Sequence, residues 1–171
     1  LAHAVKLPEG RLAKGHVLTA GDLAKLSEAG IASVIACRME PGDLGEDEAA
    51  ERCAEAIDPA NLRLSPASTG RVNFYATCNG LFVADKALVD RFNRVDPAIT
   101  LACLADHSDV RDGDLVATVK IIPLAVSANS VERARAILAE GPAFQLKPYR
   151  AHAVQLIATE LPSLKPSVMD K

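Results

Sequence analysis

The sequence predicts an α+β protein of two small lobes, with a mixed or barrel-like sheet and short helices. Its 171 residues suffice for one ordinary domain or two small lobes, and 49% of them are hydrophobic, which allows a sizeable core. Short apolar runs typical of strands alternate with amphipathic patterns typical of helices, and turn residues separate them. We expect the lobes at residues 1–60 and 61–150, and we expect residues 151–171 to lead into a further domain.

The first lobe is expected to form a strand–helix–strand unit followed by an acidic helix. Thr19 and Asp22 have the spacing of a capping box, so a helix should begin after Thr19 and end at Gly30. A second helix should span 46–57, with a stripe of small apolar residues on one side and acidic residues facing water on the other. The expected strands are 1–7 and 31–36.

The second lobe is expected to mix strands with two helices. Asp85 is a suitable N-cap for a helix over 86–95, and Asn129 or Ser130 should cap a last helix that ends near Glu140. The expected strands are 62–64, 81–84, 98–104, 115–122 and 144–149, with a hairpin-type turn at 112–114 and a strand at 152–159 that begins the next unit.

Composition argues against two classes of partner. The formal net charge is −3, and aromatic residues are only 4% with no Trp, so neither a basic surface nor stacking platforms for nucleic acid are expected. No apolar run reaches the roughly 18 residues of a membrane span, and no signal peptide opens the chain. We therefore expect a cytoplasmic protein that binds neither nucleic acid nor membrane.

The familiar catalytic and metal-binding motifs are absent from the sequence. It has no Gly-rich dinucleotide or Walker-type loop, no nucleophile elbow and no zinc-protease motif, so the catalytic residues stay unknown. The cysteines lack the C-x-x-C spacing of a metal site, and we expect small buried side chains with Cys78 as the most exposed. These cysteines are Cys37, Cys53, Cys78 and Cys103.

A polar stretch before an apolar segment is the strongest candidate for binding an anion. Hydroxyl groups, a glycine that brings backbone amides close and an arginine fork together suit a phosphate or a carboxylate. An ordinary polar turn before a strand is the alternative. Lys120 is a second candidate, because it interrupts the apolar run 116–122 and must either lie on an exposed face, pair with an acid or point into a cavity. The polar candidates are Ser68, Thr69, Gly70, Arg71 and Asn73.

Residues 106–109 contain the residue types of a hydrolytic triad. The order is Asp106, His107, Ser108 and Asp109. Residues adjacent in sequence seldom face one another in the geometry that nucleophilic catalysis requires, so a hydrolytic triad is not the favoured interpretation. If the chain is a free-standing enzyme of small molecules, Asp106 and His107 are the first residues to consider.

Six segments of the chain carry a recognisable pattern: 12–23, 29–31, 40–47, 69–73, 95–101 and 116–123. The first two contain a Gly, a short spacer, Leu-Thr, an acid, a Leu-rich turn, and then Ala-Gly-Ile and a strand. Together the segments resemble the molybdopterin-binding proteins of molybdenum cofactor biosynthesis, and in particular the N-terminal region of bacterial two-part proteins in which a molybdopterin-binding part precedes a nucleotidyltransferase-like part. Residues 152–171 are similar to the first strand and linker of a molybdopterin-binding domain.

The resemblance implies an accessory, non-catalytic part of a molybdopterin-binding protein, which lines a cleft for an anionic pterin. Arg71 and Lys120 would hold the terminal phosphate of the pterin. One segment departs from the family, because Thr159 is followed by Glu-Leu-Pro where molybdopterin molybdenumtransferases have Thr-Gly-Asp-Glu. The chain begins at Leu1 and stops at Lys171, and we expect it to be a piece of a longer protein that acts with a missing C-terminal domain.

Two other functions remain open at this point. The apolar helix faces would also suit a homodimer, in which the chain is purely a dimerisation scaffold and every ligand contact lies elsewhere. A free-standing enzyme would instead need titratable groups that converge in a cleft. No metal site is expected in any of these cases.

Overall fold

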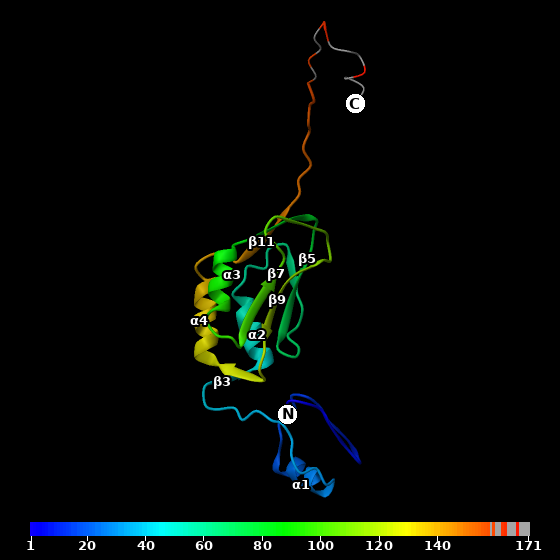
Figure 1. Cartoon of the computed structure of the whole chain (residues 1–171), viewed down its shortest axis with the longest axis vertical. Coiled ribbons are helices and arrows are strands. Elements are labelled where there is room, and N and C mark those ends of the chain that lie inside the picture. Colours follow the sequence, from blue (N-terminus) through cyan, green and yellow to red (C-terminus); the bar gives the residue numbers. More distant parts are fainter. Residues whose placement is uncertain (158, 160–161, 164–166, 168–171) are drawn as a thin grey trace.

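The computed structural model describes residues 1–157, 159, 162–163 and 167 (Figure 1). Four helices alternate with short strands along the described chain, so the predicted α+β class is confirmed. The helices are α1 (Ala20–Glu28), α2 (Glu46–Glu55), α3 (Lys86–Asn93) and α4 (Ala128–Leu138). The strands are β1 (Val5–Leu7), β2 (Gly10–Leu12), β3 (Asp43–Gly45), β4 (Leu62–Leu64), β5 (Arg71–Ala76), β6 (Gly80–Ala84), β7 (Ile99–Cys103), β8 (Ser108–Val110), β9 (Leu115–Ile121), β10 (Ala125–Ser127) and β11 (Phe144–Pro148).

Two antiparallel sheets carry the main body of the protein. One has four strands in the order β4-β5-β9-β7, and the other has three in the order β11-β6-β8. All strand pairs within the described residues are antiparallel, so the sheets are not mixed. The four-stranded sheet ends at β4 and β7 and stays open, which differs from the barrel-like form also considered above.

The core lies between the four-stranded sheet, the helices and the second sheet. Helix α2 packs against β5 and β9, α3 packs against β7, and α4 packs against both helices. Three buried phenylalanines join the sheets: the ring of Phe144 on β11 lies 5.4 Å from the rings of Phe74 on β5 and Phe82 on β6. Large aromatic side chains dominate the burial of apolar surface here, so this cluster fixes how the two sheets pack together.

Helix α2 packs into the same core as the later strands. Its buried residues, such as Ala49 and Cys53, belong to the same hydrophobic cluster as Phe144 and Leu146. This core therefore includes residues from both sides of position 60. Figure 1 shows α1 and the β1–β2 hairpin as a small unit at one end of the molecule, joined to the rest by an extended segment. Amphipathic patterning identified α2 correctly, but it could not tell which strands α2 covers.

Residues 31–36 do not form the predicted strand. The backbone amide of Ala2 donates to the carbonyl of Ile35 at 2.9 Å, but no strand is assigned there and the side chain of Ile35 is exposed. An apolar run becomes a strand only when a neighbouring strand satisfies its backbone groups. Among the described residues, the hydrogen bond from Ala2 is the one backbone bond that joins this segment to the N-terminal residues.

Three smaller predictions are also corrected. The N-cap of α4 is Ser127, whose Oγ accepts from the amide of Asn129, because the Ser130 hydroxyl instead donates to Asp96 Oδ2 at 2.6 Å. The turn at 112–114 joins β8 to β9, which belong to different sheets, so it is not a hairpin turn. Residues 151–157 form no strand and run away from the domain (Figure 1), while residue 158 and most of 160–171 lie outside the described residues.

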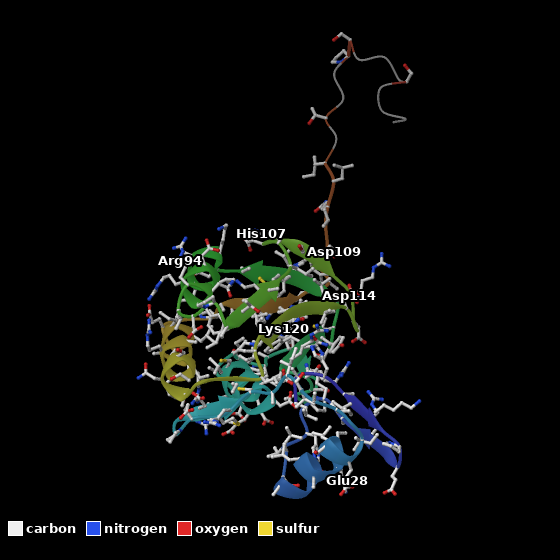
Figure 2. The ribbon with its side chains drawn as sticks, turned by 60° about the horizontal axis from the view of Figure 1, so that its bottom comes forward. Glu28, Arg94, His107, Asp109, Asp114 and Lys120 are labelled. Carbon is white, nitrogen blue, oxygen red and sulfur yellow. The ribbon has the colours of Figure 1, made fainter. Side chains whose placement is uncertain are left out.

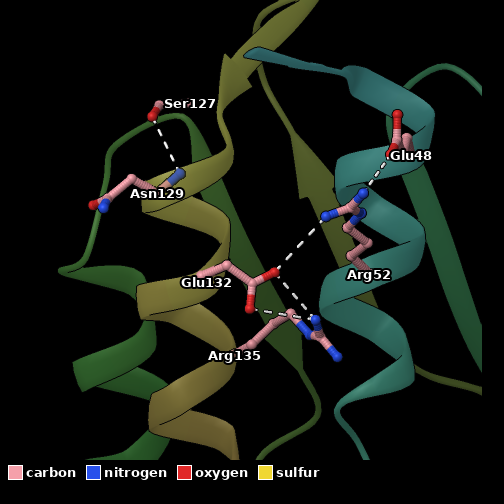
Figure 3. A network of polar contacts seen from close by, with 6 residues as sticks. All are labelled: Glu48, Arg52, Ser127, Asn129, Glu132 and Arg135. Carbon is pink, nitrogen blue, oxygen red and sulfur yellow. Dashed lines mark hydrogen bonds and ion pairs between the residues drawn. The ribbon is translucent and has the colours of Figure 1, made fainter. Parts of the chain in front are cut away.

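Charged side chains connect α2 with α4 (Figure 3). Arg52 donates to Glu48 on its own helix at 2.7 Å and lies 3.8 Å from Glu132 on α4. Arg135 donates to the same Glu132 at 3.1 Å. These groups are partly exposed, so solvent screens them and the network adds only modestly to stability. Of the acidic residues of α2, Glu48 is the one that this network includes.

The N-terminus of α1 confirms the predicted capping box. Thr19 Oγ1 accepts from the amide of Asp22 at 3.2 Å, and the Asp22 carboxylate accepts from the amide of Thr19 at 2.9 Å. Nε2 of His16 donates to the same carboxylate at 2.9 Å. The hydrogen bond from His16, followed by those from Thr19, holds the pKa of Asp22 well below its usual range. The ionised carboxylate is therefore a structural element of the N-terminal unit.

Replacing Asp22 by Asn should loosen α1. The neutral amide cannot accept the charge-assisted bonds from His16 and Thr19, so we expect the α1 amides to exchange roughly tenfold faster at neutral pH. In the native protein the same contribution is present above the ordinary pKa of an aspartate, about 4, and is lost as the pH falls toward the depressed folded-state value. Hydrogen exchange measured by NMR tests both statements, and equal exchange in variant and native protein would contradict them.

Candidate anion-binding site

The strands β5 and β9 lie at the centre of the four-stranded sheet and present one polar face. Along β5, Val72, Phe74 and Ala76 are buried, while the residues between them are partly or fully exposed. Successive side chains of a strand point to opposite faces, so the alternation places every second residue on the outer face. The outward polar residues of these two strands are Arg71, Asn73, Tyr75, Thr118 and Lys120.

The register of the sheet brings Arg71 and Lys120 together. They are direct partners across the antiparallel pair of β5 and β9, a position at which Cβ atoms are typically about 5 Å apart. Among the described residues, neither side chain has a carboxylate within 4.0 Å, in contrast to the paired cations of α2 and α4. Like charges opposite one another weaken a strand pair, and an anion between them would remove that penalty.

Next to this pair, a chain of hydrogen bonds runs across the outer face of the sheet. Thr118 Oγ1 donates to Asn73 Oδ1 at 2.9 Å, and Asn73 Nδ2 donates to the Tyr75 hydroxyl at 3.3 Å. On β4, the guanidinium of Arg63 lies over the Tyr75 ring, 4.7 Å from its centroid. Asn73 is therefore a polar link within the sheet face, and the amide orientation of its side chain is fixed by both neighbours.

Ser68, Thr69 and Gly70 form a tight turn rather than an open anion-binding loop. The backbone groups of Ser68 and Arg71 bond to each other, and Thr69 and Gly70 both have positive φ. The amide of Gly70 donates to Asp47 Oδ1 on α2 at 2.6 Å. This amide already has a carboxylate partner, so it is not free for an external anion. The turn positions Arg71 at the start of β5.

Residues 106–109 do not assemble a hydrolytic triad. His107 Nδ1 lies 2.8 Å from Asp106 Oδ2, but the Ser108 hydroxyl donates to the carbonyl of Ala105 at 2.7 Å and not to the histidine. Asp106 accepts from the amide of Ala84, which is the main cause of its lowered pKa, and Asp109 accepts from Tyr149. Figure 2 shows His107 and Asp109 at the upper rim, with Lys120 nearer the middle of the domain.

Cysteine chemistry contributes little to a site in the described chain. Burial raises the pKa of the Cys53 thiol to about 12 and also raises that of Cys103, so both are poor nucleophiles. The exposed cysteine is Cys37, whereas Cys78 is only partly exposed, which reverses the expectation from sequence. Within the described residues, no group of three or more His, Cys, Asp or Glu side chains is placed to bind a metal ion.

A hollow of about 450 Å³ lies elsewhere, between β11 and the loop before β4. Its polar lining comes from Asp58, Asn61, Gln145, Lys147 and Arg150. The Asn61 side chain donates to the carbonyl of Leu146 at 3.0 Å. None of the predicted site residues lines this hollow. The polar face around Arg71 and Lys120 is instead an open surface.

Sequence analysis identified Arg71, Asn73 and Lys120 but missed Arg63 and Tyr75. The signal for Tyr75 was present, because it continues the alternation of Arg71 and Asn73 along one strand. Arg63 could not be connected with it, since the pairing of β4 with β5 depends on a register that the sequence does not reveal.

Comparisons with known protein-family models, with curated proteins and with solved structures gave no match. The function is therefore inferred from the geometry of this face and from the sequence segments described above. No described helix has both the length and the apolar character that a membrane crossing requires.

Proposed function

We propose that this chain is the accessory, non-catalytic part of a molybdopterin-binding protein in molybdenum cofactor biosynthesis, and that its polar sheet face lines one side of a cleft for the anionic pterin. The observation that carries this proposal is the placement of Arg71 directly opposite Lys120 without an acidic partner among the described residues. The sequence segments that resemble the family supply the identity of the anion.

The two cations are chemically complementary as ligands of a terminal phosphate. The guanidinium of Arg71 can make two parallel hydrogen bonds to phosphate oxygens, while the ammonium of Lys120 acts as a compact positive charge. Both lie on the same face of the sheet, because they occupy paired positions on adjacent antiparallel strands. Ser68, Thr69 and Gly70 contribute indirectly by fixing the start of β5.

The described residues support an accessory role rather than a catalytic one. The Ser108 hydroxyl donates to the carbonyl of Ala105 and not to the adjacent histidine, and Asp106 and His107 are both exposed. The face around Arg71 is open, so a second wall must come from another part of the protein or from a partner. In this proposal the missing C-terminal domain supplies that wall and the chemistry.

Isothermal titration with pterin-6-ylmethyl phosphate tests the proposal in the full chain. Combining Arg71→Ala with Lys120→Ala should weaken binding roughly 100-fold, because hydrogen bonds to charged groups contribute about 1.5–3 kcal/mol each. Lys147→Ala is the matched control, since it removes an exposed cation at the hollow beside β11. Unchanged affinity in the double variant, or an equal loss in the control, would show that the phosphate is held elsewhere.

A further inference from the structure

The outer face of the sheet has a second feature beyond the cation pair. Arg63 stacks on Tyr75 at the far end of β5, four residues from Arg71. At about 3.3 Å per residue, the two positions are about 13 Å apart along the strand. Leu115 is the partner of Tyr75 on β9, and 48% of its surface is exposed. The face thus has the Arg71–Lys120 pair at one end and an aromatic ring, a guanidinium and an apolar side chain at the other.

The stacked pair is held in a defined geometry. The Tyr75 hydroxyl accepts from Asn73, which in turn accepts from Thr118, so the ring is restrained by a bonded chain that starts on the neighbouring strand. The guanidinium of Arg63 lies over this ring, and the residue is exposed. A planar guanidinium with an aromatic ring on one side offers its other side to a second flat group.

We propose that Arg63 and Tyr75 form a stacking platform for the planar ring system of the ligand whose phosphate is held by Arg71 and Lys120. This inference rests on the proposed function. It assigns an orientation to the ligand: the molecule lies along β5, with its phosphate at the start of the strand and its conjugated ring near the end. Leu115 provides an apolar edge beside the ring.

The charges on this sheet face indicate which kind of ligand ring it would bind. The outward positions of β5 and β9 include no Asp or Glu, so a cationic ring would find no counterion among them. A neutral or electron-rich conjugated heterocycle suits an exposed guanidinium better. Thr118 and Asn73 lie between the two ends and can hydrogen-bond a polar linker between ring and phosphate.

The test compares neopterin 3′-phosphate, in which a hydroxylated three-carbon chain separates ring and phosphate, with ethyl phosphate, which has no ring, by isothermal titration on the full chain. Stacking of a flat base on protein side chains predicts that the ring compound binds about tenfold more tightly. Arg63→Ala and Tyr75→Ala should abolish this advantage and leave the affinity for ethyl phosphate unchanged. Circular dichroism verifies that each variant is folded.

Arg63→Lys separates stacking from charge. Lysine retains the positive charge but lacks the planar group, so this variant should lose the ring advantage as fully as Arg63→Ala. Full affinity in Arg63→Lys, or an intact ring advantage in Arg63→Ala, would overturn the platform. Failure of the proposed function looks different: the affinity for ethyl phosphate would then be insensitive to Arg71→Ala and Lys120→Ala.

Discussion

Replacing Phe144 by Ala should lower the free energy of unfolding by about 3–5 kcal/mol. Phe144 is 1% exposed and contacts Phe74 edge-on and Phe82 face-on, with both ring centroids at 5.4 Å. The substitution removes the buried ring and leaves a cavity between the two sheets, and tight packing prevents full collapse. Chemical denaturation monitored by circular dichroism measures the loss.

Phe144→Leu is the matched control for this experiment. Leucine keeps much of the apolar volume but loses both aromatic contacts, so we expect a loss of about 1–2 kcal/mol. A loss below 1 kcal/mol in Phe144→Ala would mean that the two sheets are not joined through this ring.

Replacing Gly70 by Ala should cost about 2–4 kcal/mol, because the backbone conformation and the lack of space both oppose a side chain there. Gly70 has φ of 70°, and a Cβ at this position would lie 2.7 Å from the carbonyl oxygen of Ile121 and 3.1 Å from Cβ of Glu46. Relief of this clash would disturb the hydrogen bond from the Gly70 amide to Asp47 and displace the start of β5. Thermal unfolding measures the stability change.

Gly113→Ala measures the cost of placing a side chain on a residue with positive φ, without a steric clash. Gly113 also has positive φ, at 89°, but no neighbouring heavy atom lies within 4 Å of the added Cβ. We expect a loss of about 1 kcal/mol there. Equal losses of stability at the two glycines would show that the contact with Ile121 is unimportant. Because Arg71 directly follows Gly70, the Gly70→Ala variant should also bind pterin-6-ylmethyl phosphate less tightly.

The helices could be predicted well because their signals are local. The capping box of Thr19 and Asp22 and the N-cap at Asp85 are patterns within four residues, and both form as expected. The central strand at 115–121 was also predictable from its β-branched run. The run at 31–36 carried a similar signal, but it lacks a partner strand, and a pattern within one segment cannot show whether a partner exists.

The candidate site was only half predictable for a related reason. Arg71 and Lys120 each stand out in sequence, since each is a cation beside an apolar segment. Their juxtaposition depends on the register between β5 and β9, which is set by packing over the whole sheet. The amide of Gly70 donates to Asp47, 23 residues away. No local pattern in the sequence shows that this amide already has a carboxylate partner.

Side-chain ¹⁵N NMR during a titration with pterin-6-ylmethyl phosphate tests the role of the cation pair most directly. If both cations hold one phosphate, the Nε signal of Arg71 and the Nζ signal of Lys120 should shift together and saturate at the same ligand concentration. The Nζ signal of Lys147, at the distant hollow, should stay unchanged. Saturation with neither Arg71 nor Lys120 affected would contradict the assignment of this face as the phosphate site.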